Sequence, residues 1–447
     1  MNRVIHDLRK EKGYEHKGNR RTHRHAPKKC RIDTGVIVRE AGCNAAGSQQ
    51  MGKRCGIAGH IGAHGFGIRF GCYTDDLLKP TETPIRAFMR SNKGLLTARK
   101  ISGVPKISRW DAPQGCDMFY SMPAMIAAAL CKIEAAEHGD HEPLSYEMLN
   151  SRFCELMHVM GLGYAFLWFE NRNLAEELWR AFDYGDIIKR AMNYYGRDYL
   201  FLKEDDATPQ QRKQLLVWSI DHGHPVVMEG AGGIAEFSVI TGYADGGDTL
   251  IGWTYCEEFV TQTDTDGSFI HPARWEEEKP KMLVIGDKVE PTYSDKDSLL
   301  FALEALDYTE VGKTYYEQRD KQYGGKGIAG DAAYRRWLDE CTTPDGAEKV
   351  CRINDMLPYA LERNSIYAPE CALKALKKMS ERHPAQMNLW VTHTVNSFHA
   401  VKESRDAIDH YEGEDETFAE LCRKHINDCM GHRENTRNNI REMLKVL

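Results

Sequence analysis

The chain has 447 residues, more than one typical hydrophobic core holds, so two or three folded units are expected. Its 42% hydrophobic and 28% charged residues are ordinary for a soluble globular protein, and its net charge of −7 argues against nucleic acid as the main partner. No window approaches the roughly 20 apolar residues of a membrane span, so no membrane partner is expected. The basic start is followed by no apolar run, which argues against a secretory signal.

Charge and cysteines are distributed in a way that indicates compartment and partners. Residues 1–55 carry 14 Lys/Arg against 5 Asp/Glu, a net +9 that leaves −16 for the remainder. This segment is interpreted as a disordered basic arm, and the arm is the one part where a nucleic-acid or acidic partner stays open. The thirteen scattered cysteines do not form the dense framework of a small secreted domain, so reduced thiols and a cytoplasmic location are expected.

Residues 56–110 form a Gly/Pro-rich lead-in of unknown fold. Cys55, His60, His64 and Cys72 have side chains that suit zinc, but their spacing matches no standard finger, and a Gly-rich loop is the alternative. No Gly-Lys-Ser/Thr follows the glycines, so the sequence gives no support for a phosphate loop. Neither a cofactor nor a metal is predicted.

Helices dominate the next part of the chain. The Ala-rich stretch 121–136 predicts a buried helix with Ser121 as its N-cap. Ser145 and Thr208 are predicted caps of two further helices, the second over 208–222. Between them the pattern predicts a strand at 164–169, a helix at 183–195 and a strand at 199–202.

Strands gather after these helices. They are expected at 225–229, 237–241, 249–253 and 281–285, with a hairpin turn at 245–248. Helices followed by strands predict an α+β domain with an antiparallel sheet over 111–290. From 295 to 447 the periodicity is helical throughout, which predicts a separate all-α domain or a helical cap.

The stretch GHPVVMEG…EFSVITGYADGGDTLIGW follows a buried helix and a helical middle, and precedes the all-helical extension. In this order it resembles bacterial proteins of the butirosin biosynthesis protein H type. Those proteins have a cysteine-peptidase-like fold, distantly similar to bacteriocin-leader peptidases and papain. The resemblance covers about residues 111–340 and implies a papain-like antiparallel sheet with helices. It is carried by 144–169, 220–229, 240–253 and, more loosely, 327–338.

The resemblance also implies where a catalytic pair would lie. A nucleophilic cysteine would open the buried helix, at the position of Ser121, and a histidine would lie near Glu236. The orienting position, near 252–254, holds no Asp or Asn. A shifted pair is the alternative, with Cys116 in the loop before the helix and His222 or His224 as base. An ordinary loop cysteine and two surface histidines are the simpler interpretation.

Other polar and aromatic residues are expected around the same cleft, where the start of the 121–136 helix faces the 236–243 strand. Glu229 and Glu236 could bind a cation or an amine, or be exposed charges at strand ends. Tyr243 and Trp253 could line the cleft or belong to the core.

Two functional hypotheses result. In the first, the chain is a catalytically degenerate cysteine-peptidase-like protein that binds a small or peptidic ligand in this cleft. In the second, it is an acyltransferase or amide hydrolase that uses Cys116 or Ser121 as nucleophile. The missing Cys–His pair favours the first. The sequence does not indicate an oligomeric state.

Overall fold

The computed structural model describes residues 96–107, 120–139, 144–169, 182–231, 236–255, 260–271, 274–307, 327–351, 361–413 and 416–447. The basic arm, the four candidate zinc ligands and Cys116 lie outside these ranges. Contacts group Pro80–Leu447 into one compact unit. Within the described residues, no helix combines the length and the apolar character that crossing a membrane requires.

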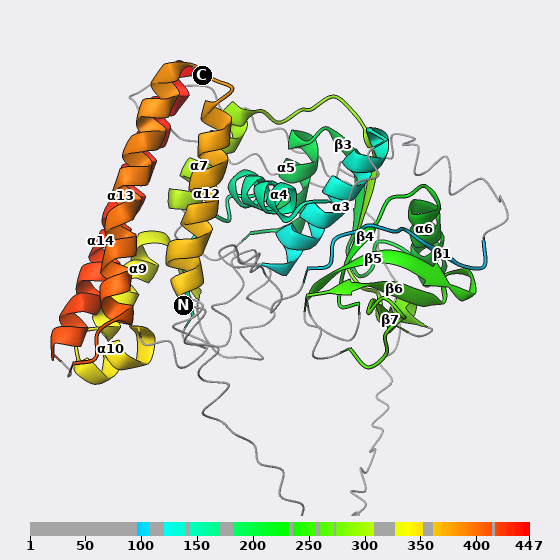
Figure 1. Cartoon of the computed structure of the whole chain (residues 1–447), viewed down its shortest axis with the longest axis horizontal. Coiled ribbons are helices and arrows are strands. Elements are labelled where there is room, and N and C mark those ends of the chain that lie inside the picture. Colours follow the sequence, from blue (N-terminus) through cyan, green and yellow to red (C-terminus); the bar gives the residue numbers. More distant parts are fainter. Residues whose placement is uncertain are drawn as a thin grey trace, which may run out of the picture. The chain divides into compact units, whose positions relative to one another are not determined.

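The main sheet is antiparallel throughout, with the order β3-β8-β4-β5-β6-β7 and with β1 paired to β5 (Figure 1). This confirms the predicted α+β class. The strands are β1 (Arg99–Lys100), β3 (Arg197–Leu202), β4 (Val226–Glu229), β5 (Phe237–Ala244), β6 (Thr249–Thr254), β7 (Phe269–His271) and β8 (Met282–Lys288). A short 3-10 turn, Asp245–Gly247, joins β5 to β6 where the hairpin turn is predicted.

Side chains of this sheet alternate between two apolar layers, as strand geometry requires. Val227, on β4, belongs to the core that includes α3 (Ser121–Glu137), whereas Val226 and Met228 belong to the core that includes α6 (Pro209–Asp221). The sheet is therefore buried on both faces, and this explains why its strands are almost continuously apolar.

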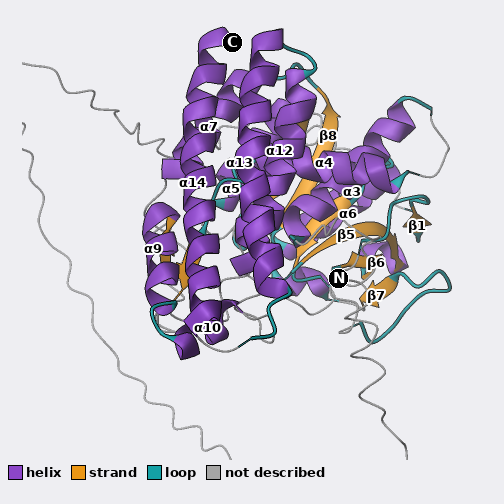
Figure 2. Ribbon diagram, turned by 60° about the vertical axis from the view of Figure 1, so that its left-hand side comes forward, coloured by secondary structure: helices purple, strands orange, loops and turns teal. Residues whose placement is uncertain are grey.

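Among the remaining helices, α4 packs on α3, and the later helices pack on α4 and on one another toward the C-terminus (Figure 2). They are α4 (Tyr146–Val159), α5 (Tyr184–Tyr194), α7 (Asp295–Asp307), α9 (Gly330–Glu340), α10 (Pro344–Cys351), α12 (Ala368–Ser380), α13 (Ala385–Asp409) and α14 (Glu416–Val446). A π-helical segment, Arg363–Tyr367, leads directly into α12. The long helices α13 and α14 lie side by side, and α12 packs on α4.

One strand interrupts the C-terminal segment that was expected to be wholly helical. β9 (Gly327–Ala329) pairs antiparallel with β2 (Leu167–Phe169) in a separate two-stranded sheet. The C-terminal helices are thus joined to the α+β part by strand pairing as well as by the packing of α12 on α4.

Two of the three predicted helix caps are confirmed. Ser145 accepts from Met148 N, and Thr208 forms a capping box with Gln211. The prediction for Ser121 is wrong, because Tyr120 takes the extended cap conformation and Ser121 is the first helical residue. Its hydroxyl is used elsewhere.

The helices α4 and α14 carry buried histidines. His425 and His432 on α14 accept or donate hydrogen bonds at Nδ1 with Ser404 (3.0 Å) and Ser397 (2.8 Å) of α13. His158, at the end of α4, pairs with the Tyr164 hydroxyl at 2.5 Å. Burial disfavours the imidazolium, so it lowers the pKa of His158 to about 4 and that of His425 and His432 to about 3.

Because of these histidines, we expect the protein to lose stability in mild acid. Their folded-state pKa values lie below the unfolded value near 6.5, so the unfolded chain takes up protons first as the pH falls. The free energy of unfolding should fall below pH ~6.5 by up to about 1.4 kcal/mol per pH unit for each histidine. Urea unfolding from pH 7.5 to 5 measures this slope. His432→Gln should make it shallower and the exposed control His410→Gln should not; equal slopes in all three proteins would contradict the prediction.

Candidate functional site

Ser121 and Glu236 meet at the start of the buried helix. The Ser121 hydroxyl donates to Glu236 Oε2 and accepts from the backbone N–H of Phe237 at 3.3 Å. Ser121 is fully buried, and Glu236 lies immediately before β5 with partial exposure. The residues that hold the expected nucleophile and base positions are therefore in direct contact.

The local sequence explains why this contact forms. The first turn of α3 reads Ser-Met-Pro-Ala, and all four residues are buried. A buried hydroxyl needs a hydrogen-bond partner, because desolvation without one is costly. Glu236, the residue before β5, lies at this point, and its carboxylate is the acceptor that Ser121 uses.

A second carboxylate lies on the neighbouring strand. Glu229 is directly opposite Phe237 in the β4–β5 pairing and forms an ion pair with Lys281 at 2.6 Å. Lys281 Nζ also lies 4.8 Å from the centre of the Tyr184 ring. Glu229 is thus mostly buried and already holds a protein cation, so it differs from the free strand-end charge that the sequence suggested as one interpretation.

The π-helical segment contributes residues that the sequence did not single out. The Tyr120 hydroxyl, next to Ser121, donates to Asn364 Oδ1, and the Arg363 guanidinium lies 5.8 Å from the Tyr120 ring centre. Arg363 Nη2 also donates to the hydroxyl of Tyr255, which follows β6, at 3.3 Å. All four side chains are buried. No motif marks Arg363 and Asn364, because their partners lie more than 100 positions earlier in the chain.

His224 lies at the far end of α3 from Ser121. Its Nδ1 contacts Ile285 O at 3.0 Å. The pKa of Glu137, the last residue of α3, is lowered mainly by its hydrogen bond with Arg197 and to a smaller degree by the nearby His224. Because α3 has 17 residues, about 25 Å of helix separates the two ends. Burial lowers the pKa of His224. His222 Nδ1 lies 2.8 Å from Trp218 O, at the end of α6.

The two aromatic candidates lie on different sides of the sheet. Trp253 pairs with Val239 and packs partly buried against the core that includes α3. Tyr243 belongs to the core that includes α6, and its hydroxyl donates to Asp221 at 2.8 Å. Val239, opposite Trp253, and Tyr243 both lie on β5, an even number of residues apart, yet they face different sides of the sheet. A register shift between Ile240 and Gly242 accounts for this change of face.

The Ser121–Glu236 pair has limited chemistry of its own. A serine hydroxyl is a weak nucleophile until a base removes its proton, and a carboxylate is a much weaker base than imidazole. The seven cysteines within the described residues are all buried, and burial raises the pKa of the Cys131 thiol, further along α3. The described part of the chain also contains no group of three or more His, Cys, Asp or Glu arranged to hold a metal.

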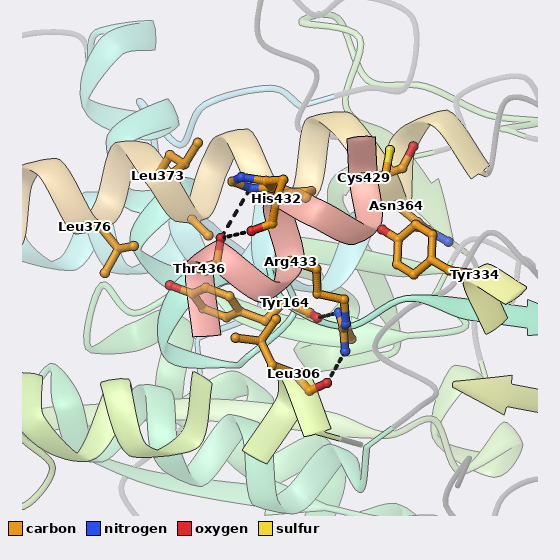
Figure 3. A pocket seen from close by; sticks show the side chains of 15 residues that line it. Tyr164, Leu306, Tyr334, Asn364, Leu373, Leu376, Cys429, His432, Arg433 and Thr436 are labelled. Carbon is orange, nitrogen blue, oxygen red and sulfur yellow. Dashed lines mark hydrogen bonds between the residues drawn. The ribbon is translucent and has the colours of Figure 1, made fainter. Parts of the chain in front are cut away.

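A small cavity lies between α12 and α14, and Asn364 is among the residues that line it (Figure 3). Its volume of about 20 Å³ fits roughly one water molecule. Arg433 reaches the carbonyls of Tyr164 and Leu306 beside it, and Thr436 donates to His432 O. The bonds of Arg433 hold α14 against the loop after α4 and the end of α7, so the cavity belongs to the packing of the helices.

The chain was compared with known protein families and with curated proteins. It matches no family model, and no curated protein matches it.

A double-mutant cycle measures the strength of the Ser121–Glu236 interaction. Hydrogen bonds to charged groups contribute about 1.5–3 kcal/mol, so Ser121→Ala and Glu236→Gln should show a coupling energy of that order. Urea unfolding of the wild type, both single variants and the double variant gives this energy. Glu147, exposed on α4, provides the control: Ser121→Ala with Glu147→Gln should be additive within about 0.5 kcal/mol. Additivity in both cycles would show that the Ser121–Glu236 contact contributes nothing.

Proposed function

We propose that this chain is a cysteine-peptidase-like protein that has lost peptidase chemistry and binds a small or peptidic ligand where the start of α3 meets β5. The observation that carries the proposal is the contact between Ser121 and Glu236. A papain-like enzyme would place its nucleophile and base at these two positions. Here the pair is a hydroxyl and a carboxylate.

The architecture supports this assignment of positions. A buried helix packs along one face of an antiparallel sheet, its first residue touches the residue before β5, and a hairpin returns along β6. This is the arrangement in which a helix N-terminus and a strand present a nucleophile and a base to one substrate. The papain-like fold is inferred from this arrangement together with the sequence resemblance.

The buried polar groups near Ser121 favour ligand binding over a purely structural role for this position. Ser121, Arg363 and Asn364 are buried, and the ion pair of Glu229 with Lys281 lies at the same end of the sheet. Buried polar groups cost stability unless they are fully paired, and apolar residues would fill the same space at lower cost. Their concentration around the former catalytic position is typical of a functional site.

Acyl transfer by Ser121 is the second candidate, and one feature favours it. Ser121 Oγ accepts the Phe237 N–H and lies at a helix N-terminus, and both would stabilise negative charge on that oxygen. Cys116 is the other nucleophile that this hypothesis allows.

Covalent probes separate the two candidates. A fluorophosphonate, which labels activated serines, should not modify Ser121 in the wild-type protein, because the carboxylate is too weak a base to activate it. Iodoacetamide mapping tests Cys116 in the same way, with Cys116→Ala as its control. Mass spectrometry locates any label. Rapid stoichiometric labelling at Ser121, lost in both Ser121→Ala and Glu236→Gln, would replace the binding proposal with acyl transfer.

Restoring the missing pair tests the cysteine-peptidase-like geometry directly. In the double variant Ser121→Cys, Glu236→His, imidazole should stabilise a thiolate at position 121. A thiol-reactive peptidyl epoxide should then label this position about tenfold faster or more than in Ser121→Cys alone. The control Ser121→Cys, Glu229→His should show no such gain. Equal rates in the three variants, each shown to be folded by circular dichroism, would contradict the proposed positions.

A further inference from the structure

A polar groove lies between helices, lined by residues of α4 and of the segments around α5, α7 and α12. It has a volume of about 430 Å³ and is formed by α4, the end of α5, the start of α7 and the end of α12. The side chains that matter for its chemistry are Arg152, Glu155, Tyr194, Asp295, Lys378 and Arg382. We call this set the α4–α12 groove. None of these residues contacts Ser121 or Glu236 in the described part of the chain.

The acidic groups of the groove are already occupied. Asp295 accepts from Tyr194 at 2.7 Å and from Arg382 at 3.1 Å, and its second oxygen lies 2.6 Å from His383 Nε2. Glu155 is contacted by Lys378 at 2.9 Å and by Arg152 at 3.5 Å. Both carboxylates are largely buried. Few acceptor positions therefore remain for a ligand.

The basic groups, in contrast, have N–H donors that make no hydrogen bond within the described residues. Arg382 makes all of its hydrogen bonds within the described residues through Nη2. Its Nε and Nη1 groups donate none there. Lys378 uses its ammonium for Glu155 and for Ser151 at 3.0 Å, so one of its three protons remains. Arg152 Nε is buried and has no hydrogen-bond partner. The side chains of Lys378 and Arg382 are 47% and 45% exposed, so solvent reaches their free donors.

This excess of donors over acceptors indicates the kind of ligand. An oxyanion brings acceptors only, and guanidinium and ammonium groups are its usual partners in proteins. Lys378 lies in the last turn of α12 and Arg382 in the turn that follows its end at Ser380, and both side chains line the groove. We propose that the α4–α12 groove binds a small molecule through a carboxylate or phosphate group, held by Arg382 and Lys378. This site is separate from the one proposed at Ser121.

Titration of the full chain with two simple oxyanions tests the proposal. Inorganic phosphate and citrate are the probes, measured by isothermal calorimetry at constant ionic strength so that general screening cancels. At least one of them should bind saturably. Binding of phosphate alone assigns a phosphate ligand, and binding of citrate alone or of both assigns a site that accepts carboxylates.

Variants locate the binding in the groove. Arg382→Gln and Lys378→Gln should each weaken the affinity about tenfold, as expected for loss of one charge-assisted contact. Lys377→Gln, one position away on the exposed face of α12, removes the same charge and should stay within about twofold. Lys378→Gln keeps the test decisive if Arg382→Gln does not fold, since Lys378 lies at the rim. No saturable binding of either anion, or equal affinities in Lys378→Gln and Lys377→Gln, would overturn the proposal.

Discussion

The burial of α3 is the constraint from which the rest of the described fold follows. Its apolar residues contact the sheet on one side and α4 on another, so the helix has almost no face for solvent. A helix of this kind cannot satisfy its first-turn polar groups with water, because water does not reach them. Every polar group at its start must therefore find a protein partner.

Ser121 and Glu236 can be understood in these terms. A cysteine at position 121 would place a weakly hydrogen-bonding thiol in the same apolar surroundings, and a neighbouring imidazole would be needed to ionise it. A serine instead donates a strong hydrogen bond to the carboxylate, which stabilises the ground state of the pair. The burial of the first turn of α3 thus accounts for the contact between Ser121 and Glu236.

Local patterns predicted most of the secondary structure, because each element carried its own signal. The Thr208 capping box and the Asp245–Gly247 turn are examples in which adjacent residues determine the conformation. Prediction failed where the conformation or the role of a residue depends on a partner far away in the sequence. β9 has three residues, and its partner strand β2 lies about 160 positions earlier. Ser121 looked like a cap by residue type, but the distant Glu236 determined its role.

The candidate site also depends on a part of the chain that its sequence resemblance does not reach. Arg363 and Asn364 come from the π-helical segment before α12. They contact Tyr120, which precedes α3, and Tyr255, which follows β6. An extra residue per turn in a π segment shifts the side chains that follow it, and such segments recur at functional sites. Because α12 also packs on α4, removing the C-terminal helices would expose α4 and strip two polar groups from the site. The C-terminal helices therefore contribute both packing and polar contacts to the α+β part.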